Sequence, residues 1–351
     1  MNSLTPERIT EELQSFQSRL ARGVQALTEV GEIETGVSSR DPVYQEDKLV
    51  LYRYRPRVAE PHPVPLLIVY ALVNRPYMMD LQEDRSMIRG LLDAGLDVYL
   101  IDWGYPDAAD RRLTLVDYLQ RYIGHCVDYL RERQRLEAIN VLGVCQGGAL
   151  SLCFAALQPE KIRNLVTMVT PVDFHTPDNL LTHLIRHVDV DLLVDTFGNP
   201  PGQLLNFAFL SLSPFRLAGQ KYVEVMDILD DAPALKNFLR MEKWIFDSPD
   251  QAGEAFRQFA KDFFQHNKLV KGEVVIGDRR VDLHNVVMPV LNVYADQDHL
   301  VPPAASRALA ECCGSRDYSE LSFRGGHIGI YVSSRAQREI PPAIADWLLA
   351  R

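Results

Sequence analysis

Residues 143–147 read Gly-Val-Cys-Gln-Gly, and this pentapeptide sets tighter limits on the fold than any other part of the chain. The apolar run Ile139–Val144 has the length of a buried strand, and residues 149–157 that follow are typical of a helix. The flanking glycines indicate a turn too tight for side chains beside neighbouring strands. A turn of this kind lifts its central residue, Cys145, above the sheet, where it can act as a nucleophile.

Cys145 is the candidate nucleophile because a thiol at the start of a helix lies at the positive end of the helix dipole. That position favours the thiolate, which is the reactive form of cysteine. The alternative for Cys145 is a small buried core residue, but its place between a predicted strand and a predicted helix favours the nucleophile. The remaining cysteines lack this setting and are assigned to packing: Cys126, Cys153, Cys312 and Cys313.

Apolar strands alternate with helices through the first half of the chain. The expected strands lie at residues 49–54, 66–73, 97–102, 139–144 and 164–169, and the expected helices at residues 84–94, 115–134 and 149–157. This rhythm predicts an α/β fold with a mostly parallel central sheet and helices on both faces. Together with the turn at Cys145, it predicts the α/β-hydrolase fold.

The rhythm stops after Pro171, and residues 175–268 have a helical and aromatic pattern before a strand resumes at residues 289–295. A helical block between two strands of one sheet is most simply an inserted cap over the sheet's carboxyl edge. We therefore predict three segments along the chain. They are a first part of the core at 1–174 that opens with an amphipathic helix at 1–30, a cap or lid at 175–285, and a second part of the core at 286–351.

A cysteine nucleophile needs a base, and the base needs a group that orients it. In the α/β-hydrolase fold an acid and then a histidine follow the nucleophile along the chain. The strand at 289–295 runs into Asp296 and Asp298, and spacing alone leaves both open as the acid. Of the nine histidines, only His327 lies late enough in a glycine-rich loop, so it is the candidate base.

Acyl transfer also needs hydrogen-bond donors for the oxyanion that develops on the substrate carbonyl. One expected donor is the backbone N–H of Gln146, directly after the nucleophile. The second is expected from the loop that follows the strand at 66–73, at Val73.

Composition argues against several kinds of partner. The chain has 47 acidic and 37 basic residues and a net charge of -10, which disfavours binding to nucleic acid. We find no apolar run of bilayer length and no apolar leader, and so expect no membrane span and a cytoplasmic location. The five cysteines are odd in number and lack Cys-x-x-Cys spacing, which predicts reduced thiols, no metal and no cofactor.

Several motifs together resemble one known family. They are residues 143–147, residues 298–302 (Asp-His-Leu-Val-Pro), residues 326–329 (Gly-His-Ile-Gly), the run at 67–78 and the turn at 102–106 (Asp-Trp-Gly-Tyr-Pro). From about residue 40 to its C-terminus the chain resembles the polyhydroxyalkanoate synthase family. Its short length is similar to the two-subunit type, class III, in which a catalytic chain works with a non-catalytic subunit.

The resemblance implies roles for particular residues. Cys145 would be the acylated nucleophile, His327 the general base and Asp298 the third member, since the family's acid directly precedes a histidine, here His299. The implied reaction polymerises (R)-3-hydroxyacyl-CoA, typically 3-hydroxybutyryl-CoA, to polyester with release of CoA. The implied partners are this substrate, the growing polyester and a second subunit, at the surface of the polyester granule; we also expect a homo-oligomer.

Two other functions stay open from the sequence. The same three residues give a cysteine-dependent thioesterase or hydrolase if water reaches the acyl-enzyme, because one fold carries many activities. The chain would instead be a non-catalytic granule scaffold if the site were vestigial. The presence of Cys145, Asp298 and His327 in the expected order counts against a scaffold.

Overall fold

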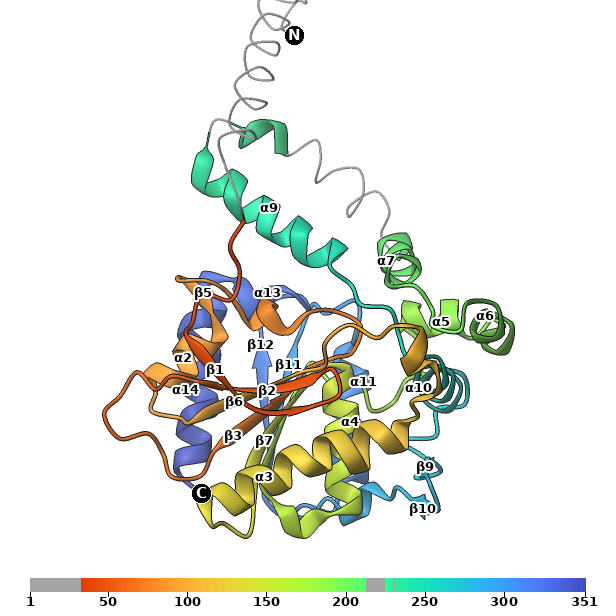
Figure 1. Ribbon diagram of the computed structural model, residues 1–351, viewed down its shortest axis with the longest axis horizontal. Coiled ribbons are helices and arrows are strands. Elements are labelled where there is room, and N and C mark those ends of the chain that lie inside the picture. The colour runs from red at the N-terminus through yellow and green to blue at the C-terminus, as the bar shows by residue number, and fades with distance from the viewer. Residues whose placement is uncertain (1–32, 213–224, 230) are drawn as a thin grey trace, which may run out of the picture.

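The computed structural model describes residues 33–212, 225–229 and 231–351, and its centre is an eight-stranded sheet (Figure 1). The strands in spatial order are β1 (Arg40–Glu46), β2 (Leu49–Tyr54), β6 (Val98–Asp102), β3 (Leu66–Val69), β7 (Ile139–Val144), β8 (Ile162–Met168), β11 (Val290–Ala295) and β12 (Tyr318–Phe323). From β6 to β12 all neighbours are parallel, while β2 is antiparallel to both β1 and β6. The predicted helix at residues 1–30 lies outside the described residues.

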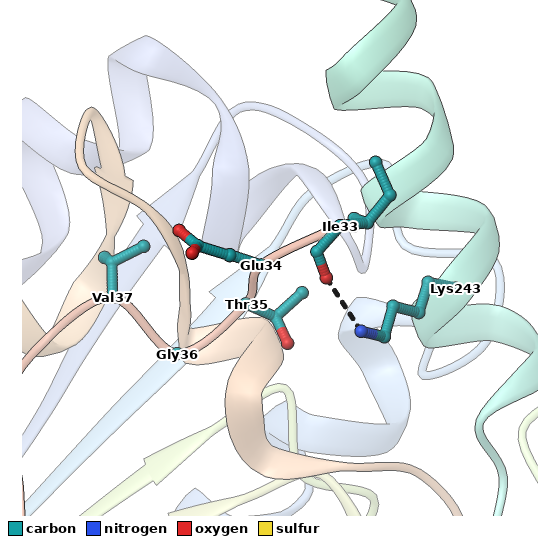
Figure 2. Close-up of a pocket in the computed structure, with 6 residues that line it drawn as sticks. All are labelled: Ile33, Glu34, Thr35, Gly36, Val37 and Lys243. Atoms are coloured by element: carbon teal, nitrogen blue, oxygen red, sulfur yellow. Dashed lines mark hydrogen bonds between the residues drawn. The ribbon is translucent and has the colours of Figure 1, made fainter. Parts of the chain in front are cut away.

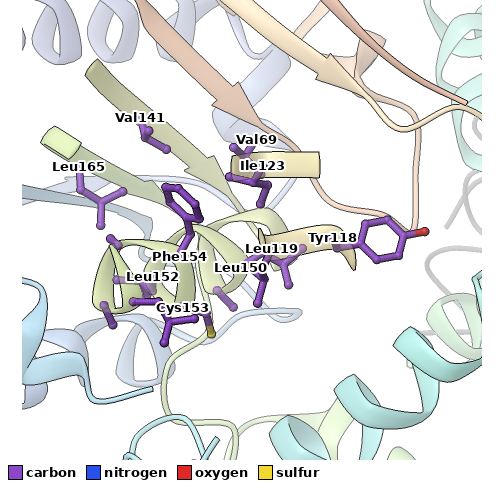
Figure 3. Close-up of a cluster of buried hydrophobic side chains, with 14 of the residues drawn as sticks. Val69, Tyr118, Leu119, Ile123, Val141, Leu150, Leu152, Cys153, Phe154 and Leu165 are labelled. Carbon is purple, nitrogen blue, oxygen red and sulfur yellow. The ribbon is translucent and has the colours of Figure 1, made fainter. Parts of the chain in front are cut away.

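Helices cover both faces of the sheet because successive side chains of a strand point to opposite sides. Val141 of β7 belongs to the core under α3 (Gly124–Gln134) and α4 (Gln146–Leu157), where it lies near Phe154 (Figure 3). The next residue, Leu142, belongs to the opposite core, under α2 (Met87–Asp93) and α14 (Ser334–Leu349). The predicted fold class, a mostly parallel sheet between two layers of helices, is confirmed.

The bounds of several predicted elements differ from those observed. The strand expected at residues 66–73 ends at Val69, because the chain leaves the sheet and forms a loop beside α4. The helix expected at residues 84–94 begins at Met87, after the Ser86 hydroxyl accepts the N–H of Arg89. Before it lies a small hairpin of β4 (Asp80–Gln82) and β5 (Arg85–Ser86), which the apolar pattern did not predict.

The long helix expected at residues 115–134 is present but changes its winding. Its first part, Asp117–Ile123, is a π-helix, and α3 continues from it. The strand β1 and the final helix α14 were not predicted. The α14 helix contains Pro341, against which Gly90 of α2 packs so closely that an added Cβ would lie 2.6 Å from the proline side chain.

The described residues between β8 and β11 are mainly helical, as predicted. The α-helices described in this segment are α5 (Leu180–Ile185), α6 (Val190–Phe197), α7 (Gly202–Ser211), α9 (Ala232–Phe246) and α10 (Gly253–Phe259), which continues into a π-helix at Ala260–Gln265; a two-stranded hairpin of β9 (Val275–Ile276) and β10 (Arg279–Arg280) follows. Figure 1 shows α9 extending away from the sheet, with α5, α6, α7 and α10 gathered to one side. The division of the chain at residues 175 and 285 stays a prediction.

A pocket lies where α9 meets the segment that leads into β1 (Figure 2). Its lining residues are Ile33, Glu34, Thr35, Gly36, Val37 and Lys243. The Lys243 ammonium donates a hydrogen bond of 2.7 Å to the carbonyl oxygen of Ile33, and Arg240 donates to the carbonyl of Glu34 at 3.1 Å. These bonds tie α9 to the start of the sheet, and none of the candidate site residues lines this pocket.

Two features are absent from the residues that the structure describes. No helix among them combines the length and the apolar character needed to cross a bilayer. The same part of the chain has no group of three or more His, Cys, Asp or Glu side chains placed to hold a metal ion.

Candidate active site

Cys145 occupies the turn between β7 and α4, with φ +54° and ψ −122°. This left-handed conformation is costly for a residue with a side chain, and such strain is typical of functional sites. Two backbone hydrogen bonds hold the turn, one from the Cys145 N–H to the carbonyl of Met168 at 2.9 Å and one from the Gly148 N–H to the Cys145 carbonyl at 2.9 Å. The structure thus places Cys145 at the predicted strand-to-helix turn.

Glycine is required on the C-terminal side of this turn. A Cβ on Gly147 would lie 2.2 Å from the carbonyl oxygen of Val69, and one on Gly148 would lie 1.8 Å from the Thr170 hydroxyl oxygen. The start of α4 therefore lies directly against the carboxyl ends of β3 and β8, which the sequence predicted from the glycines alone.

His327 and Asp298 meet at the same edge of the sheet. The distance between His327 Nδ1 and Asp298 Oδ2 is 2.7 Å, so the ring N–H donates to the carboxylate. The other carboxylate oxygen accepts the N–H groups of Leu300 at 2.8 Å and Val301 at 2.9 Å. The Asp298 side chain is fully buried and that of His327 is 11% exposed, which shields the pair from solvent.

The alternative acid, Asp296, has a different partner. Its Oδ1 accepts the backbone N–H of Gly325 at 2.9 Å, and its side chain is exposed. Asp296 therefore fixes the loop that carries His327, whereas Asp298 contacts the imidazole itself. The geometry pairs His327 with the acid that the family resemblance implies.

The pKa of His327 reflects opposing effects of its surroundings. Burial by itself lowers the pKa, but the charge of Asp298, the charge of Cys145 and hydrogen bonds with both residues raise it to about 10. The buried carboxylate of Asp298 therefore favours the protonated form of the His327 ring.

Two tyrosines beside the site were missed by sequence reasoning. Burial raises the pKa of Tyr70 and of Tyr331, and the charge of Cys145 raises both further. The ring of Tyr331 stands edge to face with that of His327, at a centroid distance of 6.1 Å, and its hydroxyl has no hydrogen-bond partner among the described residues. Tyr331 lies in the short helix α13 (Gly329–Val332) and His327 in the turn before it, and no motif in the sequence marks this contact.

The expected oxyanion donors lie on two elements that the structure brings together. The loop after β3 is held to the start of α4 by a 3.0 Å hydrogen bond from the Leu72 N–H to the side-chain oxygen of Gln146. Within the described part of the chain, neither the N–H of Val73 nor that of Gln146 has an acceptor. Two unoccupied backbone donors thus lie next to the nucleophile turn.

The strained turn at Cys145, the parallel sheet and the Asp298–His327 pair are those of an α/β-hydrolase-fold protein with cysteine at its strand-to-helix turn. A family model of the alpha/beta hydrolase fold matches residues 64–333, and a model of the poly-beta-hydroxybutyrate polymerase (PhaC) N-terminus matches residues 4–91. The chain belongs to the PhaC family of poly(3-hydroxyalkanoate) polymerase subunits.

Similar proteins match the chain over almost its whole length. The poly(3-hydroxyalkanoate) polymerase subunit PhaC of Allochromatium vinosum is 63% identical over 350 residues, with 99% of each chain covered. That of Thiocystis violacea is 60% identical and covers 99% of this chain and 98% of its own. That of Synechocystis is 56% identical and covers 98% of this chain and 94% of its own.

Solved structures show the fold at lower identity. The monoacylglycerol lipase of Paleococcus ferrophilus is 18% identical with a TM-score of 0.50, covering 86% of this chain and 98% of its own. The thioesterase domain from the curacin biosynthetic pathway is 13% identical with a TM-score of 0.51, covering 89% and 99%.

Proposed function

We propose that the chain is the catalytic subunit of a polyhydroxyalkanoate synthase that polymerises (R)-3-hydroxyacyl-CoA, 3-hydroxybutyryl-CoA above all, with release of CoA. The observation that carries the proposal is the 2.7 Å contact of His327 with the buried Asp298, next to Cys145 in its strained turn. Relatives named poly(3-hydroxyalkanoate) polymerase subunits, at 63% and 60% identity, support the same reaction.

Acylation begins with attack of the Cys145 thiolate on the thioester carbonyl carbon. The carbonyl electron pair moves onto oxygen, where the N–H groups of Gln146 and Val73 stabilise the negative charge. When the carbonyl re-forms, the bond to the CoA sulfur breaks, and the CoA thiolate takes the proton from the His327 imidazolium. One thioester replaces another, so this step is close to balanced in free energy.

Elongation needs His327 as a base rather than as an acid. Acylation removes the thiolate charge that contributes to the raised pKa of His327, so the proton affinity of the ring falls. The neutral ring can then take the proton of a 3-hydroxyl group as that oxygen attacks the acyl-cysteine. An ester bond forms, the Cys145 sulfur leaves as a thiolate, and Asp298 stabilises the imidazolium that results.

The helical segment at 175–285 would serve as the cap that keeps water from the acyl-enzyme. Its aromatic rings at Phe259 and Phe263 stack at 4.2 Å and contact Phe174 at 6.1 and 5.8 Å, which assigns these rings to packing of the segment on the core. Exposed apolar side chains on its outer helices, such as Leu192 and Phe207, support a location at the polyester surface. A second, non-catalytic subunit and a homo-oligomeric state are the proposed assembly.

The test follows CoA release and product mass together after the purified chain is given (R)-3-hydroxybutyryl-CoA. High-mass polyester that is lost in Cys145→Ala but retained in Cys313→Ala, another half-buried thiol, supports the proposal. CoA release with only free 3-hydroxybutyrate identifies a thioesterase instead. If no CoA is released even after the partner subunit is added, the enzymatic function is contradicted and the scaffold function remains.

A further inference from the structure

Two glutamine side chains hold Leu72, the residue before the expected oxyanion donor, at both of its backbone polar groups. The side-chain oxygen of Gln146 accepts the Leu72 N–H at 3.0 Å, and the side-chain amide of Gln251 donates to the Leu72 carbonyl at 3.0 Å. The carbonyl of Leu72 and the N–H of Val73 belong to one peptide plane. That bond is trans, so the two groups point in opposite directions.

We propose that Gln251 is a positioning residue that sets the direction of the Val73 N–H toward the oxyanion. By holding the carbonyl on one side of the peptide plane, the Gln251 amide fixes the N–H on the other. This inference rests on the proposed function, because it assigns the Val73 N–H to the acyl-transfer step. The N–H itself has no acceptor among the described residues, so it is available to a substrate oxygen.

Gln251 is held firmly enough to orient another group. It is 5% exposed, and its side-chain amide also donates to the Pro249 carbonyl at 3.0 Å. Its backbone N–H donates to the carbonyl of Pro200 at 3.0 Å. A side chain fixed by several hydrogen bonds keeps one rotamer, which is what an accurate donor requires.

The segment that carries Gln251 makes further contacts with the same loop. Ser248 accepts a hydrogen bond from the Asn74 side chain at 2.9 Å, and the Trp244 indole N–H donates to the Arg75 carbonyl at 2.8 Å. The Asp247 carboxylate accepts the Tyr77 hydroxyl at 3.0 Å. The loop after β3 is therefore placed by the end of α9, and the second oxyanion donor depends on how the helical segment at 175–285 docks.

Two reactions at one sulfur separate positioning from general structural support. Attack of Cys145 on a thioester puts negative charge on the carbonyl oxygen, which the Val73 N–H would stabilise. Alkylation by iodoacetamide forms a carbon–sulfur bond as iodide leaves, and no oxyanion develops. Loss of a correctly aimed donor slows only the first reaction, whereas general damage to the site slows both.

The test compares Gln251→Met with Gln265→Met. Gln265 is a matched control because its amide also donates to two backbone carbonyls, those of Ile185 and Val188, at 3.2 and 2.9 Å. We expect Gln251→Met to slow first-turnover CoA release and kcat by about tenfold to a hundredfold, with KM unchanged. We expect its alkylation by iodoacetamide to match that of the wild type, and both rates to be unchanged in Gln265→Met.

A second variant keeps the test decisive if Gln251→Met fails to fold. Gln251→Asn keeps the amide but shortens its reach, and the same selective slowing of acylation is expected. Equal slowing of acylation and alkylation, or no slowing of acylation, in the folded variants overturns the positioning role. Absence of CoA release from the wild-type chain together with its partner subunit would instead count against the proposed function, so the two failures are distinct.

Discussion

Asp298 contacts His327 with one carboxylate oxygen while its other oxygen is held by the backbone. The contact to His327 Nδ1 measures 2.7 Å, and the N–H groups of Leu300 and Val301 occupy the other oxygen. The turn thus fixes the carboxylate, and the carboxylate fixes the ring with its proton on Nδ1. Under the proposed function, this leaves Nε2 as the nitrogen that exchanges a proton with Cys145 and the substrate.

Replacement of Asp298 by asparagine is expected to favour the wrong tautomer of His327, because an amide N–H can face Nδ1 where the carboxylate accepted a hydrogen bond. We expect kcat for CoA release to fall by about a thousandfold or more. Asp296→Asn is the control, since Asp296 accepts the Gly325 N–H and asparagine can still accept it. Similar losses in the two variants would contradict the assignment of Asp298.

The raised pKa of His327 predicts a definite dependence of stability on pH. The pKa is about 10 in the folded chain and about 6.5 in an unfolded one, so the folded state binds the extra proton between these values. The stabilisation by protonated His327 is complete below about pH 6.5 and is lost as the pH rises through about 10.

Chemical denaturation of the wild type and of His327→Gln across this pH range measures the effect. The difference in unfolding free energy should be largest at the acidic end and should shrink steadily toward pH 10. Asp298→Asn removes the charge that raises the pKa most and should move the decline to lower pH. A difference in unfolding free energy between the two chains that grows with pH would contradict the raised pKa of His327 in the folded state.

The position of an element could be predicted from the sequence where it depends on the residues nearby in the chain. The strand β7 has the predicted bounds, Ile139–Val144, because a strand buried on both faces is mostly apolar; its one polar side chain, Asn140, is buried and accepts a hydrogen bond from Asn164. Cys145 follows it in the predicted turn, since only glycine fits where Gly147 touches the end of β3. The order of acid and histidine along the chain predicted that an acid directly after β11 meets His327, and the family resemblance implied Asp298 as that acid.

Other parts depend on contacts between distant segments and could not be predicted. Nothing in the run at 66–73 shows that the strand ends at Val69, because the loop that follows is held by residues 244–251 of a different segment. Asp296 and Asp298 both follow β11, so spacing alone leaves the acid open; the family resemblance implied Asp298, and the turn in three dimensions brings that carboxylate to the imidazole. Gln251 belongs to no recognisable sequence motif, and only its hydrogen bond to the Leu72 carbonyl in the folded chain indicates a role.

Gly147 offers a test of the nucleophile turn that does not depend on activity. An alanine Cβ would meet the carbonyl oxygens of Val69 and Tyr70 at 2.2 and 2.5 Å, and backbone atoms of a central strand cannot move aside. We expect Gly147→Ala to lose about 3 kcal/mol or more of unfolding free energy, or to fail to fold. Gly329→Ala is the control, because no atom lies within 4 Å of its added Cβ, and it should stay within about 0.5 kcal/mol. A Gly147→Ala chain as stable as the wild type would argue against the close approach of α4 to β3.

Tyr77 and Tyr105 share the carboxylate of Asp247, and their different exposure predicts different contributions to stability. The Tyr77 hydroxyl donates at 3.0 Å and is half-buried, whereas the Tyr105 hydroxyl donates at 2.7 Å from a side chain that is 51% exposed. Water replaces the exposed bond readily, so we expect Tyr77→Phe to cost about 1.5 kcal/mol of unfolding free energy and Tyr105→Phe less than about 0.5 kcal/mol.

Denaturation of each tyrosine variant, with Asp247 intact and with Asp247→Ala, isolates the coupling energy of each pair. This coupling energy should be larger for Tyr77 although its hydrogen bond is the longer one. Equal coupling of both tyrosines, or a larger one for Tyr105, would mean that bond length rather than burial decides how firmly the end of α9 holds the loop after β3.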